Sequence, residues 1–434
     1  MVGWSTEQVA HAAGARLVAP SPHGHGPTRA TIDSRDVGPG DLFVGLVGAH
    51  VDGGRFATEA LAAGAWGVLV APEHADAAWA QARGAEGEGA PRAAPGVLLA
   101  ADDPLRALQD LATAWRRALG ARVIGITGST GKTSTKDILR AMLRPHRRTV
   151  ATPQNLNTEI GLPLTVLSAP GDTEVLVLEM GMRGEGQIAE LARIAEPDVG
   201  VIVSVGPVHL ELLGTVERVA AAKAELLHSL PTGGTAIVPA GEGLLTGHLP
   251  DHVAVVTFGP GGDVSDLASV ELPFDAEHLR RNAMAALGAA RAIGVEPAGA
   301  IEVELSDRRG QRHELPGGVI VVDDCYNANP MSMRAALDEL ARAPGRRVAV
   351  LGDMLELGPD EVAFHEEIGR YAVQRADVLV TVGPLAAHMD GGHATADVDE
   401  AAAVVREVMR PGDTILIKAS RGVGLQAVAE ALAA

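Results

Sequence analysis

Val123-Ile124-Gly125-Ile126-Thr127-Gly128-Ser129-Thr130-Gly131-Lys132-Thr133 is the stretch that decides the fold of the middle of the chain. Its first four residues predict a buried strand and residues 133–143 are compatible with a helix, so a glycine-containing loop lies at a helix N-terminus. Backbone N–H groups there can converge on phosphate oxygens, Lys132 can reach terminal phosphates, and the Thr133 hydroxyl can bind Mg²⁺. The general phosphate-loop pattern has glycine where this chain has Ile126, so the stretch predicts a variant phosphate loop.

Strands and helices alternate outward from this loop. Apolar strands are predicted at 174–178 and 199–205, and the helices between them imply a mostly parallel central sheet of the phosphate-loop type. A strand at 318–324 opens a second alternating unit, with further strands predicted at 347–351, 378–382 and 414–418. This pattern is typical of a doubly wound, Rossmann-like sheet.

The region before the loop predicts a small α/β domain. Residues 28–70 contain two short strands with a helix between them, whereas residues 73–96 lack apolar periodicity and are expected to form a mobile insertion. From Asp103 to Leu119 apolar residues recur at helical spacing behind a cap and Pro104, and a second domain starts there. We therefore expect a three-domain α/β protein divided into 1–101, 102–314 and 315–434.

Composition excludes several classes of protein. The formal charge of -19 over 434 residues repels a polyanion, so nucleic-acid binding is not expected, although a local pocket can still hold a small phosphorylated ligand. No apolar run reaches the roughly 18 to 20 residues of a membrane helix, so we expect no membrane insertion. The N-terminus has no export signal and the single cysteine, Cys325, cannot form a disulfide framework, which predicts a cytoplasmic address.

Polar residues follow the strands of the central sheet on the edge that carries the loop. Glu179 ends one predicted strand and His209 follows the next, and the carboxyl ends of parallel strands are where ligands bind. A carboxylate at this edge is a usual partner of nucleotide-bound Mg²⁺. Taken alone, Glu179 could be a surface carboxylate, His209 a structural histidine, and Lys223, on an alanine-rich helix, a solvated lysine. Asn155 and Asn157 could belong to a turn.

In combination these features resemble the Mur ligase family, in order and over nearly the whole chain. The matching features are the phosphate loop, Glu179-Met180-Gly181, His209 and Ala222-Lys223-Ala224-Glu225. Three further segments resemble the family member that adds D-alanyl-D-alanine: Asp33-Ser34-Arg35 with Phe43-Val44-Gly45-Leu46, Tyr326-Asn327-Ala328-Asn329-Pro330, and Leu351-Gly352-Asp353-Met354-Leu355-Glu356-Leu357-Gly358. The run from Tyr326 to Pro330 is the most discriminating of these.

The resemblance implies a role for each matching residue. The catalytic residues would be Lys132, Glu179, His209 and Lys223. Two Mg²⁺ ions would be served by Thr133, Glu179, His209 and a carbamylated Lys223. ATP would contact Thr127, Gly128, Ser129, Thr130, Gly131, Lys132 and Thr133, with Asn282 on the adenine side and Asn327 and Asn329 from the third domain. The substrates would contact Ser34, Arg35, Asn155, Asn157, Thr158, Asp353, Lys418, Ser420 and Arg421.

The activity implied by the resemblance is ATP-dependent amide-bond formation in peptidoglycan synthesis. The peptide carboxylate of UDP-N-acetylmuramoyl-tripeptide would attack the γ-phosphate of ATP, and the amine of D-alanyl-D-alanine would displace phosphate from the resulting acyl phosphate. Such chemistry relies on positioning and charge stabilisation rather than on a side-chain nucleophile. We expect a monomer. Two alternatives stay open: a sister ligase that adds diaminopimelate or lysine, or glutamate to folate, and a catalytically silent nucleotide-binding scaffold.

Overall fold

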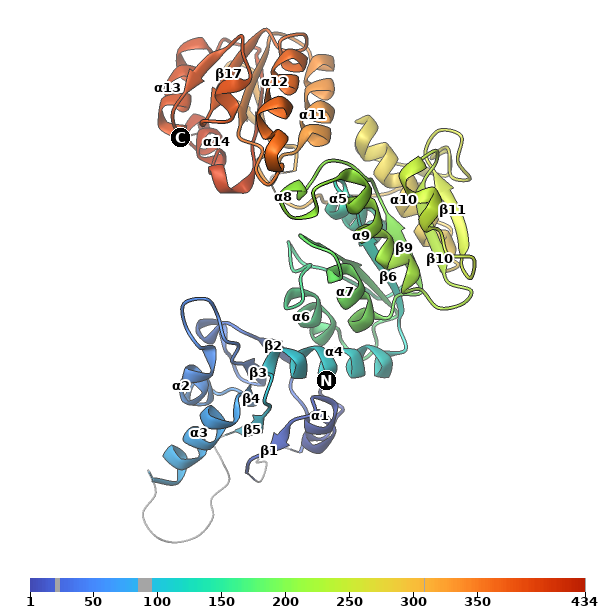
Figure 1. Ribbon diagram of the computed structural model, residues 1–434, viewed down its shortest axis with the longest axis vertical. Coiled ribbons are helices and arrows are strands. Elements are labelled where there is room, and N and C mark those ends of the chain that lie inside the picture. The colour runs from blue at the N-terminus through green and yellow to red at the C-terminus, as the bar shows by residue number, and fades with distance from the viewer. Residues whose placement is uncertain (20–23, 85–95, 308, 434) are drawn as a thin grey trace.

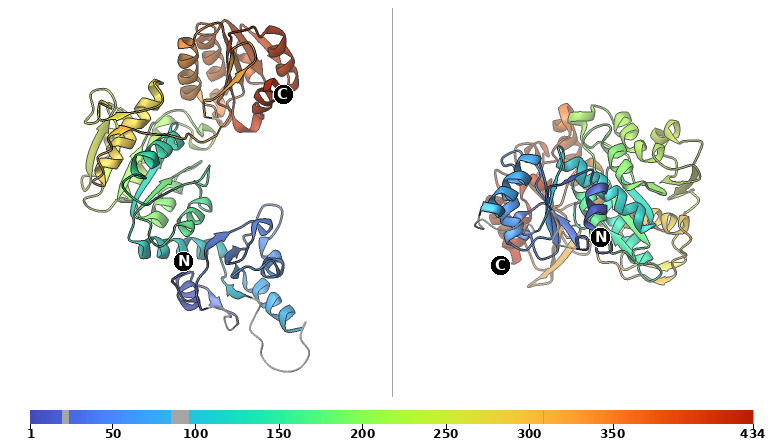
Figure 2. Two further views of the ribbon diagram at one scale, coloured as in Figure 1. Left: turned by 180° about the vertical axis from the view of Figure 1, so that it is seen from behind. Right: turned by 90° about the horizontal axis from the view of Figure 1, so that it is seen from below.

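The described part of the chain, residues 1–19, 24–84, 96–307 and 309–433 of a computed structural model, folds into three α/β units. They are arranged along the long axis of an elongated molecule, with the N-terminal unit at one end and the C-terminal unit at the other (Figure 1). The view from behind shows the same order (Figure 2). Within these residues, no helix is both long and apolar enough to cross a membrane. The predicted α/β class with three units is confirmed.

The N-terminal unit is built on a mostly parallel sheet. Its strands are β1 (Arg16–Leu17), β2 (Arg29–Thr31), β3 (Asp41–Val44), β4 (Gly67–Val70) and β5 (Val97–Ala100). They lie in the order β1-β5-β4-β3-β2, and β1 pairs antiparallel with β5. The helical segments are α1 (Thr6–Ala12), η1 (Ser34–Asp36), η2 (Gly53–Phe56), α2 (Ala57–Ala62) and α3 (Pro72–Gly84).

The mobile insertion expected at 73–96 is wrong for its first half. Residues 72–84 form α3, because Pro72 suits a helix start, Glu73 favours the N-terminal turn and the following alanines have high helix propensity. Ala75 and Ala78 are buried against the sheet. Alanine is sufficient where a helix packs closely on a sheet, which is why no pattern of large apolar residues indicated this helix. Residues 85–95 lie outside the described residues.

The central unit carries the phosphate loop on a sheet whose described strand pairs are all parallel. Its strands are β6 (Arg122–Thr127), β7 (Thr149–Ala151), β8 (Val175–Glu179), β9 (Val199–Ile202), β10 (Thr235–Pro239) and β11 (Ala254–Phe258). They lie in the order β11-β10-β9-β6-β8-β7. Strands such as β8, buried along their whole length, lie between two layers of helices and therefore read as continuous apolar runs.

The helices of the central unit include the one that connects it to the N-terminal unit. They are α4 (Pro104–Leu119), α5 (Lys132–Leu143), α6 (Gly161–Ser168), α7 (Gln187–Ala195), α8 (Leu210–Leu213), α9 (Val216–His228), η3 (Gly243–His248) and α10 (Glu277–Ala292). A small parallel pair, β12 (Val270–Glu271) and β13 (Gly299–Ala300), lies beyond the main sheet. The predicted start of α4 is confirmed, since the Asp103 side chain accepts a hydrogen bond from the Arg106 N–H.

The C-terminal unit is a second doubly wound sheet. Its strands are β14 (Gln311–Leu315), β15 (Val319–Asp323), β16 (Arg347–Gly352), β17 (Val378–Val382), β18 (His393–Thr395) and β19 (Thr414–Lys418). They lie in the order β14-β15-β19-β16-β17-β18, parallel except for β14, so the expected boundary at 314/315 falls inside β14. Its helical segments are α11 (Pro330–Arg342), η4 (Gly358–Asp360), α12 (Glu361–Ala372), η5 (Ala386–His388), α13 (Val398–Val408), η6 (Arg421–Val423) and α14 (Gln426–Ala433).

A buried histidine fixes the turn that follows β16. His365 of α12 is 0% exposed, and its Nε2 accepts a hydrogen bond from the backbone N–H of Met354 at 2.9 Å. Its Nδ1 lies 2.6 Å from the carbonyl oxygen of Glu361, to which a neutral ring can donate. Burial lowers the pKa of His365, so the folded state favours the neutral ring, which satisfies both contacts.

Acidification should therefore destabilise the protein through His365. The unfolded ring takes up a proton near its ordinary pKa of about 6.5 and the folded ring only at lower pH, so this contribution is present above that pH and lost as the pH falls through the folded value. His365→Gln should lower stability at neutral pH yet flatten its decline between about pH 7 and 5, measured by urea unfolding. His393→Gln, at an exposed position of the same unit, is the matched control. A decline identical to that of the unmodified chain would contradict the prediction.

Candidate active site

The phosphate loop runs from the end of β6 into α5. Gly131 immediately precedes the helix with a φ of 81°, a left-handed value that glycine adopts without strain. There is also no room for a side chain, because a Cβ at this position would lie 2.6 Å from Oδ1 of Asn282. The structure thus places the buried Asn282 of α10 directly against the loop. The first amides of α5, which have no partner within the helix, are available to an anion.

Residues after β9 hold the loop in shape. The Thr130 N–H donates to Oγ of Ser204 at 2.8 Å, and that hydroxyl donates to the Thr130 carbonyl at 3.0 Å. Ser129 and Gly206 form a similar reciprocal pair, with both hydrogen bonds at 3.0 Å. No motif in the sequence indicated Ser204. The available signal was its position just after β9, the strand that pairs with β6.

Glu179 lies beside the loop at the end of β8. Its Oε2 accepts a hydrogen bond from the Thr133 hydroxyl and its Oε1 one from the Asn157 side-chain amide, each at 2.7 Å. The Glu179 N–H donates to the Thr152 hydroxyl at 2.9 Å. The residue is only 2% exposed, so the surface-carboxylate alternative is wrong. The carboxylate is buried and oriented toward the loop.

Two lysines lie beside the loop, the half-buried Lys132 and the buried Lys223. Nζ of Lys132 donates to the Gly128 carbonyl at 2.8 Å. Lys223 of α9 is 2% exposed and lines the same cleft, and no described residue forms a hydrogen bond or ion pair with its Nζ. The solvated-lysine alternative is therefore wrong. Burial, together with the charge of Lys132, holds the pKa of Lys223 well below its usual value. Burial also lowers the pKa of Lys132, despite the opposing effect of Glu179.

His209 lies at the boundary with the C-terminal unit. Its Nδ1 is 2.6 Å from Oε2 of Glu356, and Nε of Arg183 is 3.7 Å from the other oxygen of that carboxylate. Both His209, with φ 53°, and Glu356, with φ 64°, have left-handed backbone conformations that are strained for residues other than glycine. Burial lowers the pKa of His209, against the opposing effect of Glu356. The hydrogen-bonded pair of His209 and Glu356 therefore joins the two units beside the loop, with both backbones strained.

Lys418 is the main buried cation on the opposite side of the boundary. It ends β19 at 2% exposure, with Nζ 2.6 Å from Oδ2 of Asp324. It also donates to the Asn327 carbonyl at 3.0 Å, which fixes the loop after β15. Lys418 thereby determines where Asn327 meets the cleft.

Two other predicted residues shape the loops around that position. Asn329 caps α11, with its side chain accepting a hydrogen bond from the Ser332 N–H at 3.0 Å. Oγ of Ser420 accepts one from the Leu355 N–H at 2.9 Å. Both residues have structural contacts of their own in addition to lining the cleft.

A cleft of about 1950 Å³ lies between the central and C-terminal units. That volume exceeds the roughly 300 to 1,000 Å³ of a typical site for one small molecule, so it has room for more than one substrate. The predicted residues that line it are Thr127, Ser129, Thr130, Gly131, Lys132, Thr133, Asn155, Asn157, Thr158, Glu179, His209, Lys223, Asn282, Asn327, Asn329, Lys418, Ser420 and Arg421.

Three predicted substrate residues lie outside this cleft. Ser34 and Arg35 belong to η1 in the N-terminal unit, where hydrogen bonds from Arg35 lower the pKa of Asp33 to about 2. Oδ1 of Asp353 accepts a hydrogen bond from the Ala386 N–H at 2.7 Å and so stabilises the start of η5. Their substrate contacts stay predictions.

Arg309 is a cleft residue that no motif in the sequence indicated. It lies in the linker between the central and C-terminal units, with its guanidinium carbon 3.9 Å from the centre of the Tyr326 ring. Within the described ranges its Nε is buried without a hydrogen-bond partner. The only signal in the sequence was a basic pair just before the third sheet, which does not indicate where either side chain points. Arg309 adds a cation to the cleft, close enough to Lys132 for its charge to contribute to the lowered pKa of that lysine.

Comparisons with known proteins agree with this arrangement. Models of the Mur ligase catalytic, middle and glutamate ligase domains match residues 28–116, 126–273 and 308–421. The UDP-N-acetylmuramoyl-tripeptide–D-alanyl-D-alanine ligase of Mycobacterium tuberculosis is 38% identical, with 100% of this chain and 98% of the relative covered.

Two solved structures have the same architecture. MurF from Acinetobacter baumannii is 27% identical with a TM-score of 0.84, over 99% of this chain and 98% of the other. MurF ligase from Thermotoga maritima in complex with ADP is 30% identical with a TM-score of 0.80, over 93% and 96%. The order of the matching domains, the full-length likeness and the cleft at their junction lead to one conclusion: this chain belongs to the Mur ligase family.

Proposed function

We propose that this chain is an ATP-dependent ligase that joins D-alanyl-D-alanine to UDP-N-acetylmuramoyl-tripeptide. Its products would be the pentapeptide precursor of peptidoglycan, ADP and phosphate, formed by a monomer in the cytoplasm. The observation that carries the proposal is the cleft in which the phosphate loop, Glu179 and Lys223 share one sheet edge. The choice of D-alanyl-D-alanine over a single amino acid is supported by the likeness to relatives named for that substrate, one of them 35% identical in Bacillus subtilis.

The reaction proceeds in two steps that need no covalent enzyme intermediate. A carboxylate oxygen of the tripeptide attacks the γ-phosphorus, and the bond to ADP breaks to leave an acyl phosphate. The amine of D-alanyl-D-alanine then attacks the acyl carbon, phosphate leaves and the amine loses a proton. Lys132, the first amides of α5 and Arg309 offset the charge on the transferring phosphoryl group, which is where such enzymes gain most of their rate.

The residues beside the loop fit Mg²⁺ that arrives with the nucleotide. In the described ranges, no three His, Cys, Asp or Glu side chains gather into a metal site. Mg²⁺ in nucleotide sites is bound by phosphate oxygens, water and one or two carboxylates. Glu179 would provide one carboxylate, and Thr133 and His209, which line the same cleft, would provide further ligands. When bound, the ion neutralises phosphate charge.

Carbamylation of Lys223 would supply the second carboxylate. Its lowered pKa increases the fraction of neutral amine, and a neutral amine attacks CO₂ to form an N–C bond with loss of a proton. The product is an anion beside Lys132, which replaces the unfavourable approach of two cations with an attraction. Carbamylation would therefore explain why Lys223 is buried without an ion pair.

The function is tested with purified chain, ATP, Mg²⁺, UDP-N-acetylmuramoyl-tripeptide and D-alanyl-D-alanine, by measuring phosphate release and product mass. We expect phosphate and the pentapeptide only in the complete mixture. Diaminopimelate, lysine or glutamate, each with its matching acceptor, should give no product. Product from one of these would identify a sister ligase, and ADP binding without phosphate release under any condition would identify a scaffold.

Gly131→Ala should weaken ADP binding by roughly tenfold or more, a loss of about 1.4 kcal/mol. The added Cβ would lie 2.6 Å from Oδ1 of Asn282, so the loop would have to shift away from the shape that presents its amides to phosphate. The matched control is Gly120→Ala, at a φ of 61° with no atom within 4 Å, where the backbone cost is paid away from the loop. Calorimetric titration with ADP distinguishes them. Equal affinity for both variants would refute the role of the close approach.

Lys223→Ala should abolish phosphate release while leaving the unfolding midpoint close to that of the unmodified chain, since the lost packing of the buried side chain is offset by removal of a buried amine that has no ion pair. A carbamate should be visible by carbon NMR with isotopically labelled bicarbonate. That signal should disappear in Lys223→Ala. It should persist in Lys418→Ala, because the amine of Lys418 is ion-paired with Asp324 and is not expected to form a carbamate. Full activity of Lys223→Ala, or a signal that survives the substitution, would exclude a carbamate at this site.

A further inference from the structure

The distribution of lysine in this chain singles out one residue that the reaction above does not use. Among 36 basic residues only Lys132, Lys136, Lys223 and Lys418 are lysines. The last three are each 2% exposed and Lys132 lines the cleft, so arginine provides the basic side chains of the described surface. Lysine is a compact cation on a flexible stem and arginine a rigid fork, so the two are not interchangeable at a confined position. Lys136 lies in α5 behind the loop, outside the cleft-lining set.

Lys136 connects α5 to the residues that orient Glu179. Its Nζ donates to the Thr152 carbonyl at 2.9 Å, and the hydroxyl of the same threonine accepts the Glu179 N–H at 2.9 Å. Thr152 is 1% exposed, so solvent does not compete for either contact. On its other side, Nζ lies 3.0 Å from Oδ1 of Asp137. A buried ion pair therefore adjoins the strand end that carries the catalytic carboxylate.

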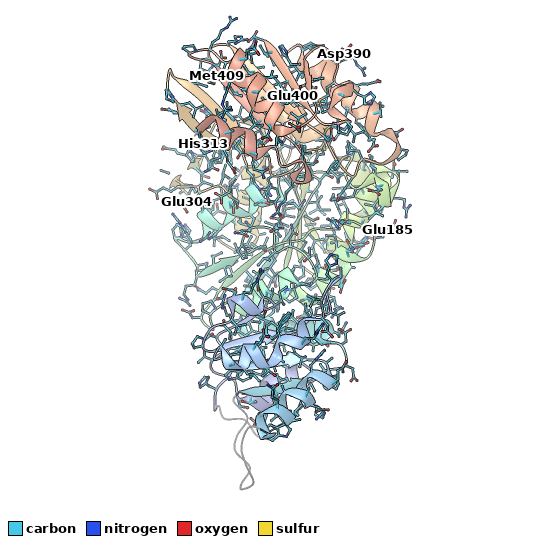
Figure 3. The ribbon with its side chains drawn as sticks, turned by 90° about the vertical axis from the view of Figure 1, so that its left-hand side faces the viewer. Glu185, Glu304, His313, Asp390, Glu400 and Met409 are labelled. Carbon is cyan, nitrogen blue, oxygen red and sulfur yellow. The ribbon has the colours of Figure 1, made fainter. Side chains whose placement is uncertain are left out.

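The second oxygen of Asp137 holds the linker between the central and C-terminal units. Oδ2 accepts hydrogen bonds from the N–H of Ser306 at 2.9 Å and from its hydroxyl at 2.8 Å. Val303 and Leu305, just before this serine, pack against the core of the central unit. In Figure 3, Glu304 and His313 lie one above the other near the boundary between the central and C-terminal units. The linker is thus fastened to α5 at Ser306.

Arg309 follows three positions after this fastening and stacks on Tyr326 in the cleft. We propose that Asp137, held by Lys136, is a positioning residue that fixes the linker at Ser306 so that Arg309 reaches the phosphate loop. This inference rests on the proposed ligase function, because it assigns Arg309 to the transferring phosphoryl group. Lys136 also holds Thr152, which in turn binds the Glu179 N–H. The positions of Arg309 and of the Glu179 carboxylate therefore both depend on α5.

Stability alone does not account for such a buried pair. Desolvation of two charges offsets most of their attraction, and apolar replacements of similar size are often neutral or stabilising. The pair instead fixes the orientation of the Asp137 carboxylate, because one oxygen contacts Lys136 and the other accepts the hydrogen bond from Ser306. Misplacing a reacting group by about 1 Å can lower a rate by roughly a hundredfold, so a fixed linker has a large kinetic effect.

The test uses Ser306→Ala in the full chain, which removes one hydrogen bond without leaving a buried charge unpaired. We expect kcat for D-alanyl-D-alanine-dependent phosphate release to fall by about tenfold, because the linker loses definition, while KM for ATP changes less than about twofold. In an Arg309→Ala background, the same substitution should have no further effect on kcat. Ser168→Ala, which removes an exposed hydroxyl bonded to the Thr165 carbonyl in α6, is the matched control.

Asp137→Asn gives a second, independent measurement. It should reproduce the loss in kcat, and combining it with Ser306→Ala should not multiply the two losses, because both act on one contact. Unchanged kcat in Ser306→Ala, or equal losses with and without Arg309, would overturn the inference while the unmodified chain still forms product. An unmodified chain that forms no product with any acceptor would instead overturn the proposed function.

Discussion

The hydrogen bond from the Thr133 hydroxyl to the Glu179 carboxylate joins the first turn of α5 to the end of β8. It exists because β6 and β8 are neighbouring parallel strands, so the loop after one and the last residue of the other emerge at the same edge. Asn157 and Thr152 complete the surroundings of the carboxylate from two further segments. The position of Glu179 beside the loop therefore depends on the register of the central sheet.

The opposite wall of the cleft belongs to a different unit, and side-chain pairs beside the loop join the two units. The pair formed by His209 and Glu356 is one of them, and both residues have backbone conformations that their neighbours must enforce. A side chain at Gly358 would press on the backbone of Leu210, so the two loops approach closely. Strain at a junction of this kind is tolerated where the position of one unit relative to the other serves the chemistry.

Several charged side chains lie in the interior of this protein, although removing a charge from water is unfavourable. Lys136, Lys223 and Lys418 are buried, as are Glu179 and Asp137. Most of these charges are paired at hydrogen-bonding distance, which limits their desolvation cost. Lys223 is the exception, and its depressed pKa shows how the protein accommodates it, by favouring the neutral amine. The buried Lys223 is therefore accommodated as a neutral amine rather than through an ion pair.

The sequence by itself determined the three units, the phosphate loop and the strand-end positions of Glu179 and His209, because strand and helix periodicity and glycine spacing are local properties. Its resemblance to a family supplied Lys223, which helical composition alone would have left on the surface. The helix at 72–84 was missed because alanine carries little periodic signal. Tertiary structure decided the rest: the pairing of His209 with Glu356, the contact of Gly131 with Asn282, and the stacking of Arg309 on Tyr326 in the cleft. These contacts join residues far apart in the chain, and their partners are set by strand order and by the placement of one unit on another, which no local pattern encodes.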